Sequence, residues 1–512
     1  MKQVTRFFGK NSIHSFLLPV FFTLHNYIQY YGLVSVGVAL KTMAIIMLVL
    51  LFLFLLLFLF TRHVARCLQI ITLISFVFLF YGIIKDFISK TAGLPFFASY
   101  SVLLPLMLLC TLVLCAVIWR KKDFFRINLF QNVLLLLFIL ADTGQMIFTQ
   151  SQFFLSKNML VKKDLLQAGN VSRPAERPDV YYLLFDCYPG TGFLRNFMQF
   201  DNSPMDSTLQ GRGFRVINDS RSNYNRTVFS MASALNFEYL HNINNNTVIT
   251  PQTYTQSRLS IKYGAVPELF DHLGYKLYNL SIFEIGHQPP LHREDFLTLP
   301  EQRVLLYNTL GERFKADVLW NFISGKYSIG LLRKVYVVQQ SEVVAAEVEK
   351  RAFNDKVADS LQSIPRKRDS LPKFVYAHFY LPHPPFFYDE KGNSNDLNFV
   401  VTEKSLLDKH LFISYLQYTN KVMLRMIDSI LVNAQRPPVI IVQSDHGFRD
   451  FEGGPSAPYL FFKNYIAFYF PDRDYHGLYD TLSNVNTFPI VFNKYFNTRI
   501  PMQKDTSTFL PY

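Results

Sequence analysis

The run Thr42–Phe60 contains no charged side chain and is made up of nearly all Leu, Phe, Ile or Met residues. As a helix, an apolar run of this length is long enough to cross the hydrocarbon core of a bilayer, which is about 30 Å thick. Part of this chain is therefore expected to be a membrane protein. The composition agrees, because only 17% of the 512 residues are charged, against about 25% in typical soluble domains.

Four further apolar stretches follow the same pattern, and we predict five transmembrane helices in all. The additional stretches are Ile13–Leu24, Cys67–Ile84, Ser101–Trp119 and Ile127–Phe148. The first is short, but it does not end in the small-residue cleavage site of a secretory signal, so we expect it to remain as a span.

Basic residues flank these stretches in three clusters: Lys2, Arg6 and Lys10; Arg62 and Arg66; and Arg120, Lys121, Lys122 and Arg126. With five spans, all three clusters fall on one side, which the positive-inside rule assigns to the cytoplasm. The remainder of the chain is then extracytoplasmic, and the family resemblance described below suggests a bacterial envelope.

The formal charge of +13 does not indicate a nucleic-acid partner. Residues 1–150 hold 12 Lys and Arg against 3 Asp and Glu, whereas the other 362 residues hold 39 against 35. The excess positive charge thus belongs to the membrane flanks, and no basic-aromatic patch accompanies it.

Asp142 is the one charged residue within a predicted span. It is expected either near the outer interface or in a contact with another helix or a lipid substrate. A single carboxylate is too little for an ion path, which argues against a transporter.

Three parts are predicted: a transmembrane anchor over 1–150, a linker over 151–177 and a soluble domain over 178–512. In the last part, short β-branched or aromatic runs alternate with helical patterns. The predicted strands are Asp179–Phe185, Tyr275–Leu280, Lys373–Phe379, Val439–Val442 and Tyr465–Phe470. Such alternation is typical of an α/β domain with a mostly parallel sheet flanked by helices.

Two of these strands end in side chains that bind metals. Asp186 follows the first, and Asp445 and His446 follow Val439–Val442. Ligands of open α/β sheets bind at the carboxyl ends of strands. Two carboxylates and an imidazole would hold one divalent cation (Mn, Zn, Mg or Ca) and leave a coordination position open. The alternative for each motif alone is a polar turn.

Three residues elsewhere are candidates for the chemistry. Thr227 stands at the start of a predicted helix, where a hydroxyl beside a cation would be a nucleophile; the alternative is an ordinary cap. His383, held in P-H-P-P-F, could bind a phosphoryl oxygen or protonate a leaving group. Arg226 is a weaker candidate for anion binding.

Four motifs together resemble the alkaline phosphatase/sulfatase superfamily: D-V-Y-Y-L-L-F-D-x-Y-P, S-R-S-N-Y-x-x-T-x-x-S-x-A-S, H-F-Y-L-P-H-P-P-F and Q-S-D-H-G. Within it, the chain looks like the membrane-bound proteins related to lipoteichoic acid synthases and phosphoethanolamine transferases. The resemblance covers Pro178 to Pro501. It implies that Asp186, Thr227, Asp445 and His446 hold one divalent metal, that Thr227 is the nucleophile and that His383 binds substrate.

Two positions depart from the family pattern. Thr227 is followed by V-F-S-M in place of the x-P-x-R of sulfatases, which argues against sulfate-ester hydrolysis. Cys187 stands where the family's D-G-Y would have glycine. The ligands of a second metal are not identified; His287 and His292 are loop candidates.

The sequence therefore predicts a membrane-anchored phosphotransferase or hydrolase. It would transfer a phospho head group from a phospholipid or envelope glycan through a phospho-threonine intermediate. The alternatives are a sulfuric or phosphoric ester hydrolase with a small or glycan substrate, and a non-catalytic scaffold on the same fold.

Overall fold

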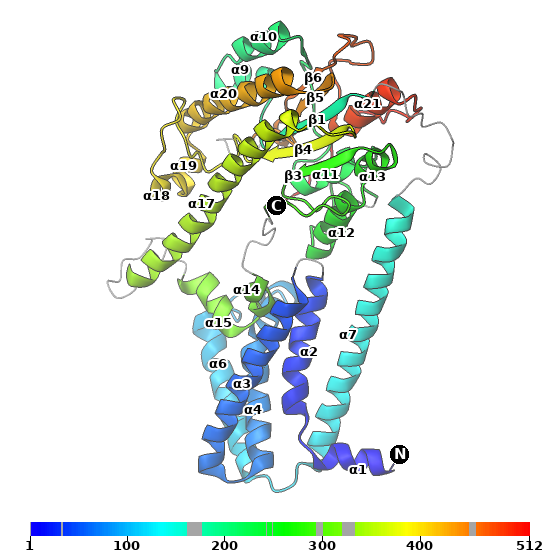
Figure 1. Cartoon of the computed structure of the whole chain (residues 1–512). Coiled ribbons are helices and arrows are strands. Elements are labelled where there is room, and N and C mark those ends of the chain that lie inside the picture. Colours follow the sequence, from blue (N-terminus) through cyan, green and yellow to red (C-terminus); the bar gives the residue numbers. More distant parts are fainter. Residues whose placement is uncertain are drawn as a thin grey trace. The chain divides into compact units, whose positions relative to one another are not determined.

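The computed structural model divides the chain into two compact units. Unit 1 comprises Met1–Gln152 and Asp295–Tyr336, and unit 2 comprises Phe153–Glu294 and Val337–Tyr512 (Figure 1). The structure describes residues 2–31, 34–160, 177–241, 243–247, 249–292, 301–319, 333–449 and 457–511. Most of the predicted linker, residues 161–176, lies outside these ranges, whereas residues 151–160 continue a helix.

Unit 1 is helical throughout its described elements. These are α1 (Lys2–Lys10), α2 (His14–Gln29), α3 (Val36–Thr61), α4 (Val64–Leu79), α5 (Tyr81–Asp86), the π-helical η1 (Phe87–Thr91), α6 (Tyr100–Arg120), α7 (Phe125–Leu160), α14 (Glu301–Leu306), α15 (Leu310–Phe314) and the π-helical η2 (Lys315–Leu319).

Within the described residues, three helices are long and apolar enough to cross a membrane: α3, α6 and the Phe125–Phe148 part of α7. The pair α4 and α5, bent by 55°, makes a fourth if it counts as one span. The predicted span Ile13–Leu24 lies in α2, which has 16 residues and falls short of that length. The multi-pass character is thus confirmed, with three or four such spans in place of five.

Helix α2 is nevertheless integrated into unit 1. Leu18 and Phe22 pack in a core cluster with Leu79 and Leu135. Polar contacts join it to its neighbours as well. The His14 ring lies 2.8 Å from Thr72 Oγ1 and 3.2 Å from Asn128 Oδ1. These buried polar positions explain why α2 is less uniformly apolar than α3.

Asp142 takes part in a second contact of α2. It is buried, and its carboxylate lies 3.2 Å from His25 Nδ1. The predicted contact with another helix is therefore present, and the position of Asp142 near the outer interface stays a prediction.

The segment 295–336 belongs to unit 1, although the sequence assigned it to the soluble domain. Ser35 N donates to Glu301 Oε2 at 2.8 Å, and Gly82 N donates to Asn308 O at 2.8 Å. Arg313 Nη2 lies 2.6 Å from Asp86 Oδ2. Polar and charged contacts therefore attach α14 and α15 to the ends of the apolar helices.

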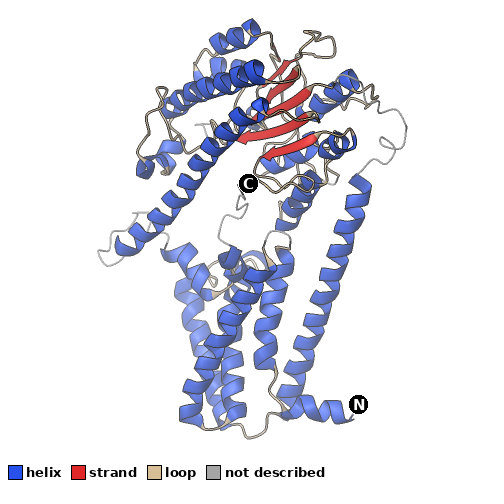
Figure 2. Cartoon of the chain, viewed as in Figure 1, coloured by secondary structure: helices blue, strands red, loops and turns tan. Residues whose placement is uncertain are grey.

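Unit 2 contains a six-stranded sheet with helices on both sides (Figure 2). Its strands are β1 (Asp179–Phe185), β2 (Arg215–Val216), β3 (Lys276–Leu280), β4 (Lys373–Phe379), β5 (Pro438–Gln443) and β6 (Ile466–Tyr469). The order is β2-β6-β5-β1-β4-β3. Strands β3, β4, β1 and β5 are parallel to one another, β6 pairs antiparallel with β5, and β2 pairs antiparallel with β6. This confirms the predicted α/β class with a mostly parallel sheet.

The helical elements of unit 2 follow the predicted alternation with the strands. They are α9 (Thr191–Met198), α10 (Ser203–Gly211), α11 (Thr227–Ala234), α12 (Pro251–Lys262), α13 (Ala265–His272), α17 (Arg333–Ser363), η4 (Ile364–Arg366), α18 (Leu397–Val400), α19 (Glu403–Leu406), α20 (Lys409–Asn433), η6 (Pro458–Phe462), η7 (Asn484–Asn486) and α21 (Thr487–Tyr495).

Strand β1 occupies the centre of the sheet, and all seven of its residues are buried. Its neighbours β4 and β5 are buried along their whole length as well. On one face, the Tyr182 ring packs against Tyr376 and against Phe488 of α21, with ring centroids 5.2 and 5.0 Å apart. A parallel strand buried on both faces reads as a continuous apolar run, which is why these strands were recognisable in the sequence.

Candidate metal site

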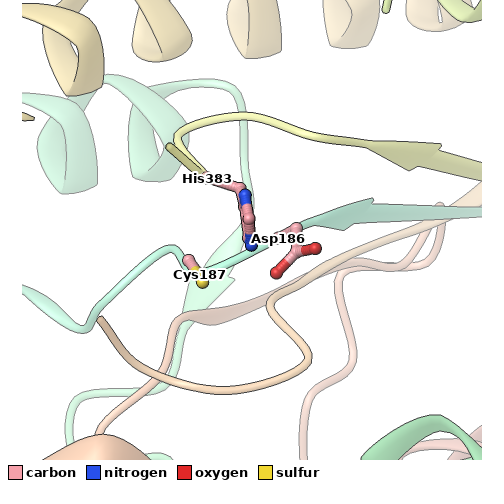
Figure 3. A group of neighbouring side chains, drawn as sticks. All are labelled: Asp186, Cys187 and His383. Carbon is pink, nitrogen blue, oxygen red and sulfur yellow. The ribbon is translucent and has the colours of Figure 1, made fainter. Parts of the chain in front are cut away.

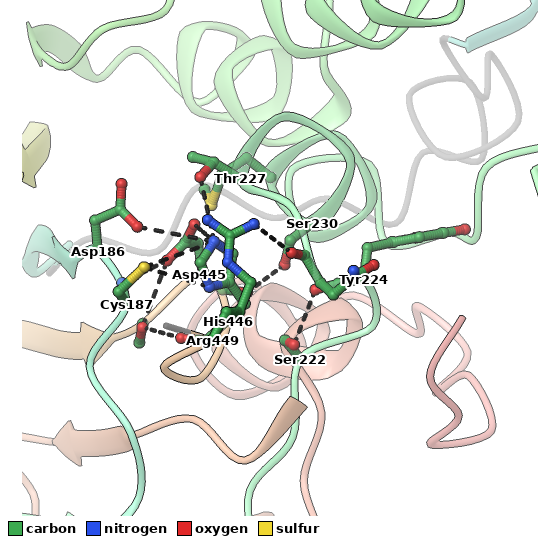
Figure 4. Close-up of polar contacts among 12 residues, drawn as sticks. Asp186, Cys187, Ser222, Tyr224, Thr227, Ser230, Asp445, His446 and Arg449 are labelled. Atoms are coloured by element: carbon green, nitrogen blue, oxygen red, sulfur yellow. Dashed lines mark hydrogen bonds and ion pairs between the residues drawn. The ribbon is translucent and has the colours of Figure 1, made fainter. Parts of the chain in front are cut away.

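Asp186, Asp445 and His446 meet at the carboxyl ends of β1 and β5. The two strands are adjacent and parallel, with Leu184 opposite Gln443, so the residues that follow them lie at the same edge. All three side chains are buried, and one ligand atom of each lies within 4.8 Å of the others (Figure 4). The sequence prediction that separate strand ends bring these side chains together is confirmed.

The carboxylates carry buried oxygens that the rest of the protein does not satisfy. Asp445 Oδ1 accepts from Cys187 N at 3.2 Å. Asp445 Oδ2 and Asp186 Oδ1 are buried and make no hydrogen bond to a described residue. Leaving a buried carboxylate oxygen without a partner is costly, so these two atoms fit a bound cation.

His446 presents a lone pair to the same place. Its Nδ1 lies 2.8 Å from Gly447 O, and since a carbonyl only accepts, Nδ1 carries the proton and Nε2 does not. Burial lowers the pKa of His446 to about 4, with the nearby Asp445 charge opposing the shift and Arg449 adding to it. Nε2 nevertheless lies only 3.1 Å from Asp445 Oδ2. Two electron-pair donors at this distance repel each other, and a cation bound between them would remove the repulsion. A histidine whose other nitrogen donates to a carbonyl is also typical of metal ligands.

The electrostatics of the carboxylates point the same way. Burial and repulsion by Asp445 raise the pKa of Asp186 well above its ordinary value. For Asp445, burial also acts to raise the pKa, but the electrostatic effect of the adjacent His446 ring and the hydrogen bonds to the carboxylate, including that from Cys187 N, outweigh burial, so the pKa is lowered. Two carboxylates this close repel each other, and a divalent cation would remove that repulsion.

Thr227 is the first residue of α11 and contributes its hydroxyl to the cluster. Its Oγ1 lies 3.5 Å from His446 Nε2. Helix α11 is also bonded to the backbone of the segment that carries the metal ligands, because Ser230 Oγ donates to Asp445 O at 2.6 Å. The predicted helix start and the predicted metal ligands are therefore joined directly.

His383 reaches the cluster from the loop after β4. Together with Asp186 and Cys187 it forms a second group whose ligand atoms lie within 4.8 Å of one another (Figure 3). Its Nδ1 donates to Pro384 O at 2.5 Å, which leaves Nε2 as the acceptor. Burial, followed by the charges of Lys350 and Arg449, lowers the pKa of His383 to about 3. A neutral ring in this tautomer has a lone pair and no proton to offer.

Arg226 donates from its guanidinium to Tyr254 OH at 3.4 Å and to Pro511 O at 3.1 Å. Its charge also acts on His446, and its role in anion binding stays a prediction. The histidines considered for a second metal, His287 and His292, belong to neither ligand group found among the described residues.

Sequence reasoning missed Arg449. Its Nη1 donates to Asn225 O, two residues before Thr227, at 2.9 Å, and its charge acts on Asp186, His383 and His446. The feature of the sequence that could have identified Arg449 is its position three residues after His446 in the same loop.

The loop that carries His446 has little freedom. Gly447 N donates to Phe461 O at 2.7 Å, and a Cβ on Gly447 would lie 2.6 Å from Lys463 O. Asn484 Nδ2 donates to Ser444 O and to Asp445 O, both at 3.0 Å. Backbone contacts from neighbouring segments thus fix both ligands after β5.

No family model matches the sequence, and no curated protein matches it either. Among solved structures, lipooligosaccharide phosphoethanolamine transferase A (EptA) from Neisseria meningitidis is 14% identical with a TM-score of 0.37, and the match covers 95% of each chain. The zinc complex of the C-terminal periplasmic domain of EcEptC from Escherichia coli is 12% identical with a TM-score of 0.37, covering 66% of this chain and 90% of that one.

The phosphonate monoester hydrolase SpPMH from Silicibacter pomeroyi is 14% identical with a TM-score of 0.38, covering 65% of this chain and 76% of that one. The solved structures found in this way therefore include phosphoethanolamine transferases, the group of enzymes that the four sequence motifs resemble.

Proposed function

We propose that this chain is a membrane-anchored, metal-dependent enzyme of the alkaline phosphatase/sulfatase superfamily that transfers or hydrolyses a phosphoric ester. One observation carries the proposal: Asp445 Oδ2 and the unprotonated Nε2 of His446 lie 3.1 Å apart in a buried cluster, with the Thr227 hydroxyl 3.5 Å from the same Nε2. An arrangement of this kind supports a cation beside a nucleophile.

Asp186, Asp445, His446 and Thr227 would hold the cation. When bound, a divalent cation would lower the pKa of the threonine hydroxyl and offset the negative charge that develops on the phosphoryl oxygens. The donor set of carboxylate oxygens and imidazole nitrogen is accepted by zinc and manganese in particular.

The proposed reaction has two displacements. Thr227 Oγ forms a bond to phosphorus while the bond from phosphorus to the leaving alcohol breaks, and the proton of the Thr227 hydroxyl leaves with that alcohol. An acceptor alcohol or water then attacks phosphorus, the bond to Thr227 Oγ breaks, and the proton of the incoming hydroxyl ends on Thr227 Oγ. His383 Nε2, unprotonated and half-buried, is suited to accept a hydrogen bond from the incoming hydroxyl or to serve as a ligand.

The apolar helices support a substrate at a membrane surface, a phospholipid or an envelope glycan. We place the enzyme domain on the extracytoplasmic side, because the basic clusters after α3 and after α6 share one side when α4 and α5 count as one span, and α7 then crosses to the other side.

The test uses the full-length protein in detergent, supplied with zinc or manganese and incubated with an aryl phosphodiester or with phospholipid. We expect a mass adduct on Thr227 that Thr227→Ala abolishes, along with a loss of turnover on the order of a thousandfold or more. Thr402→Ala, which removes a hydroxyl that caps α19, is the control and should keep both.

A folded, metal-loaded protein that forms no adduct and turns over no phosphoric ester would contradict the proposal. A cellular role that survives Thr227→Ala would favour the scaffold in its place.

A further inference from the structure

Helix α1 carries its apolar and its basic side chains on two opposite faces. A helix turns by about 100° per residue, so Val4, Phe7 and Phe8 fall on one face. Arg6 and Lys10 fall on the other. The helix has nine residues, too few to cross a bilayer. A helix with one apolar and one basic face is typical of segments that lie in the plane of a membrane interface.

The described part of the protein leaves the apolar face of α1 largely uncovered. Val4 is 57% exposed and Phe7 is 56% exposed. The half-buried ring of Phe8 lies beside the Phe7 ring, with centroids 5.5 Å apart. Because removing apolar surface from water is favourable, an apolar phase that covers these side chains would stabilise the arrangement.

Contacts with α7 hold α1 at the end of a membrane-spanning helix. Asn132 Nδ2 of α7 donates to Phe8 O and to Asn11 O, both at 2.7 Å. A Cβ on Gly9 would lie 2.3 Å from the ring of Phe125, the residue at which the apolar part of α7 begins. Helix α1 runs across the axis of α7 at this end (Figure 1). It is therefore placed at the level where a span enters the bilayer.

The charges around α1 are mostly positive. In α1 and in residues 120–126, six of the described side chains are basic and exposed, and one exposed side chain is acidic. The basic residues are Arg6, Lys10, Arg120, Lys121, Lys122 and Arg126, and the acidic residue is Asp123. Anionic lipids attract basic side chains near the membrane surface. A leaflet that contains such lipids supplies both the negative charge and the apolar phase that this end of the protein matches.

We propose that α1 is an interfacial helix that binds anionic phospholipid. Val4 and Phe7 lie among the upper parts of the acyl chains, and Arg6 and Lys10 face the phosphate groups of the lipids. The inference makes no use of the reaction proposed above, so either of the two can fail alone.

The test places a single tryptophan on the apolar face of α1 in the full-length protein. The two native tryptophans, Trp119 and Trp320, are first replaced by phenylalanine, and Phe7→Trp is then introduced. The protein is reconstituted into nanodiscs of phosphatidylcholine and phosphatidylglycerol, with or without bromine on the acyl chains. Val4→Trp, on the same face, serves as the reporter if Phe7→Trp does not fold.

We expect a blue-shifted tryptophan emission that the brominated acyl chains quench. A second measurement is the enrichment of phosphatidylglycerol over phosphatidylcholine among lipids that copurify with the protein. The double variant Arg6→Gln/Lys10→Gln should lower this enrichment about fivefold or more. The double variant Lys404→Gln/Lys504→Gln removes the same charge from two exposed lysines of unit 2 and should keep it.

Emission typical of water-exposed tryptophan, with no quenching by the brominated lipids, would overturn the proposal. Blue-shifted but unquenched emission in a dimeric protein would overturn it in favour of an interface between two copies of the chain. Quenching with a lipid enrichment that is absent, or equal in the two double variants, would overturn the assignment to anionic lipid.

Discussion

At the scale of single residues, the site depends on which nitrogen of each histidine is protonated. His446 and His383 both donate Nδ1 to a backbone carbonyl, of Gly447 and Pro384. Both therefore turn an unprotonated Nε2 toward the carboxylates. Local backbone geometry, rather than the strands, sets this orientation, and for that reason the sequence predicted the residues but not their tautomers.

Zinc should stabilise the protein through this site. At a free concentration a hundred times the dissociation constant, a ligand that binds only the folded state contributes about 2.7 kcal/mol. We expect a zinc-dependent rise in Tm that Asp445→Asn removes, because the amide keeps the contact with Cys187 N but loses the charge. Asp206→Asn changes a carboxylate that accepts from Tyr465 OH and belongs to neither ligand group found among the described residues, so it should keep the zinc effect. An equal loss of the effect in both variants would contradict the site.

Asp206 offers a test of pH dependence away from the cluster. Burial raises its pKa, and the hydrogen bond from Tyr465 opposes the shift only in part. Between the unfolded pKa of about 3.9 and the higher folded pKa, the folded state keeps a proton that the unfolded state has lost. The free energy of unfolding therefore falls as pH rises through this window. Asp206→Asn should gain stability relative to the parent over the same window.

Asp201→Asn is the control with the opposite sign. Hydrogen bonds from Ser203 lower the pKa of Asp201, so its carboxylate stabilises the folded state above the unfolded pKa. Its asparagine variant should lose stability relative to the parent as pH rises. Thermal unfolding between pH 3 and pH 7 would measure both, and equal slopes for the two variants would contradict the assignment.

At the scale of elements, the sequence predicted the strands well because buried parallel strands are continuous apolar runs. Residues Asp179–Phe185 and Lys373–Phe379 were predicted with the bounds that the structure has. The two-residue strand β2 was missed, because Arg215–Val216 carries no periodicity. Strand β6 pairs antiparallel with β5. The direction of a strand depends on this long-range pairing, so the local sequence pattern could not predict it.

Gly447 shows how an element fixes the site. A Cβ there would contact three backbone carbonyls at 2.6 to 3.1 Å, and backbone cannot yield as a flexible side chain does. Gly447→Ala should therefore cost about 1–3 kcal/mol and weaken zinc binding, as measured by thermal unfolding and metal titration. Gly192→Ala, with open space around the new methyl group, should be neutral or slightly stabilising. Unchanged stability and zinc binding in Gly447→Ala would show that the loop adapts.

At the scale of the whole molecule, the segment 295–336 was not predicted to belong with the membrane helices. Its assignment to unit 1 depends on contacts between residues that are more than 200 positions apart, such as Arg313 with Asp86. No window of the sequence contains both partners, so composition and periodicity could not reveal the pairing.

Arg313 is the residue to test in this segment. Its side chain is 9% exposed and pairs at 2.6 Å with Asp86, whose side chain is 35% exposed, and losing a charged hydrogen bond of this kind costs about 1–3 kcal/mol. Arg313→Met should therefore speed hydrogen exchange in 301–319. Lys90→Ala removes an exposed partner of the Asp86 carboxylate. An exposed ion pair contributes less than about 1 kcal/mol, so this variant should leave hydrogen exchange in 301–319 unchanged. Equal exchange in both variants would mean that the pair does not hold the segment.

The division of the chain has a practical consequence for anyone who wants unit 2, with the candidate metal site, alone. The polypeptide passes between the units at three places, after Gln152, after Glu294 and after Tyr336. Expression from residue 178 onward would carry residues 295–336 along without the helices that they contact. A version without the apolar helices therefore needs an internal deletion of residues 295–336, with a linker in their place, in addition to removal of the N-terminal helices.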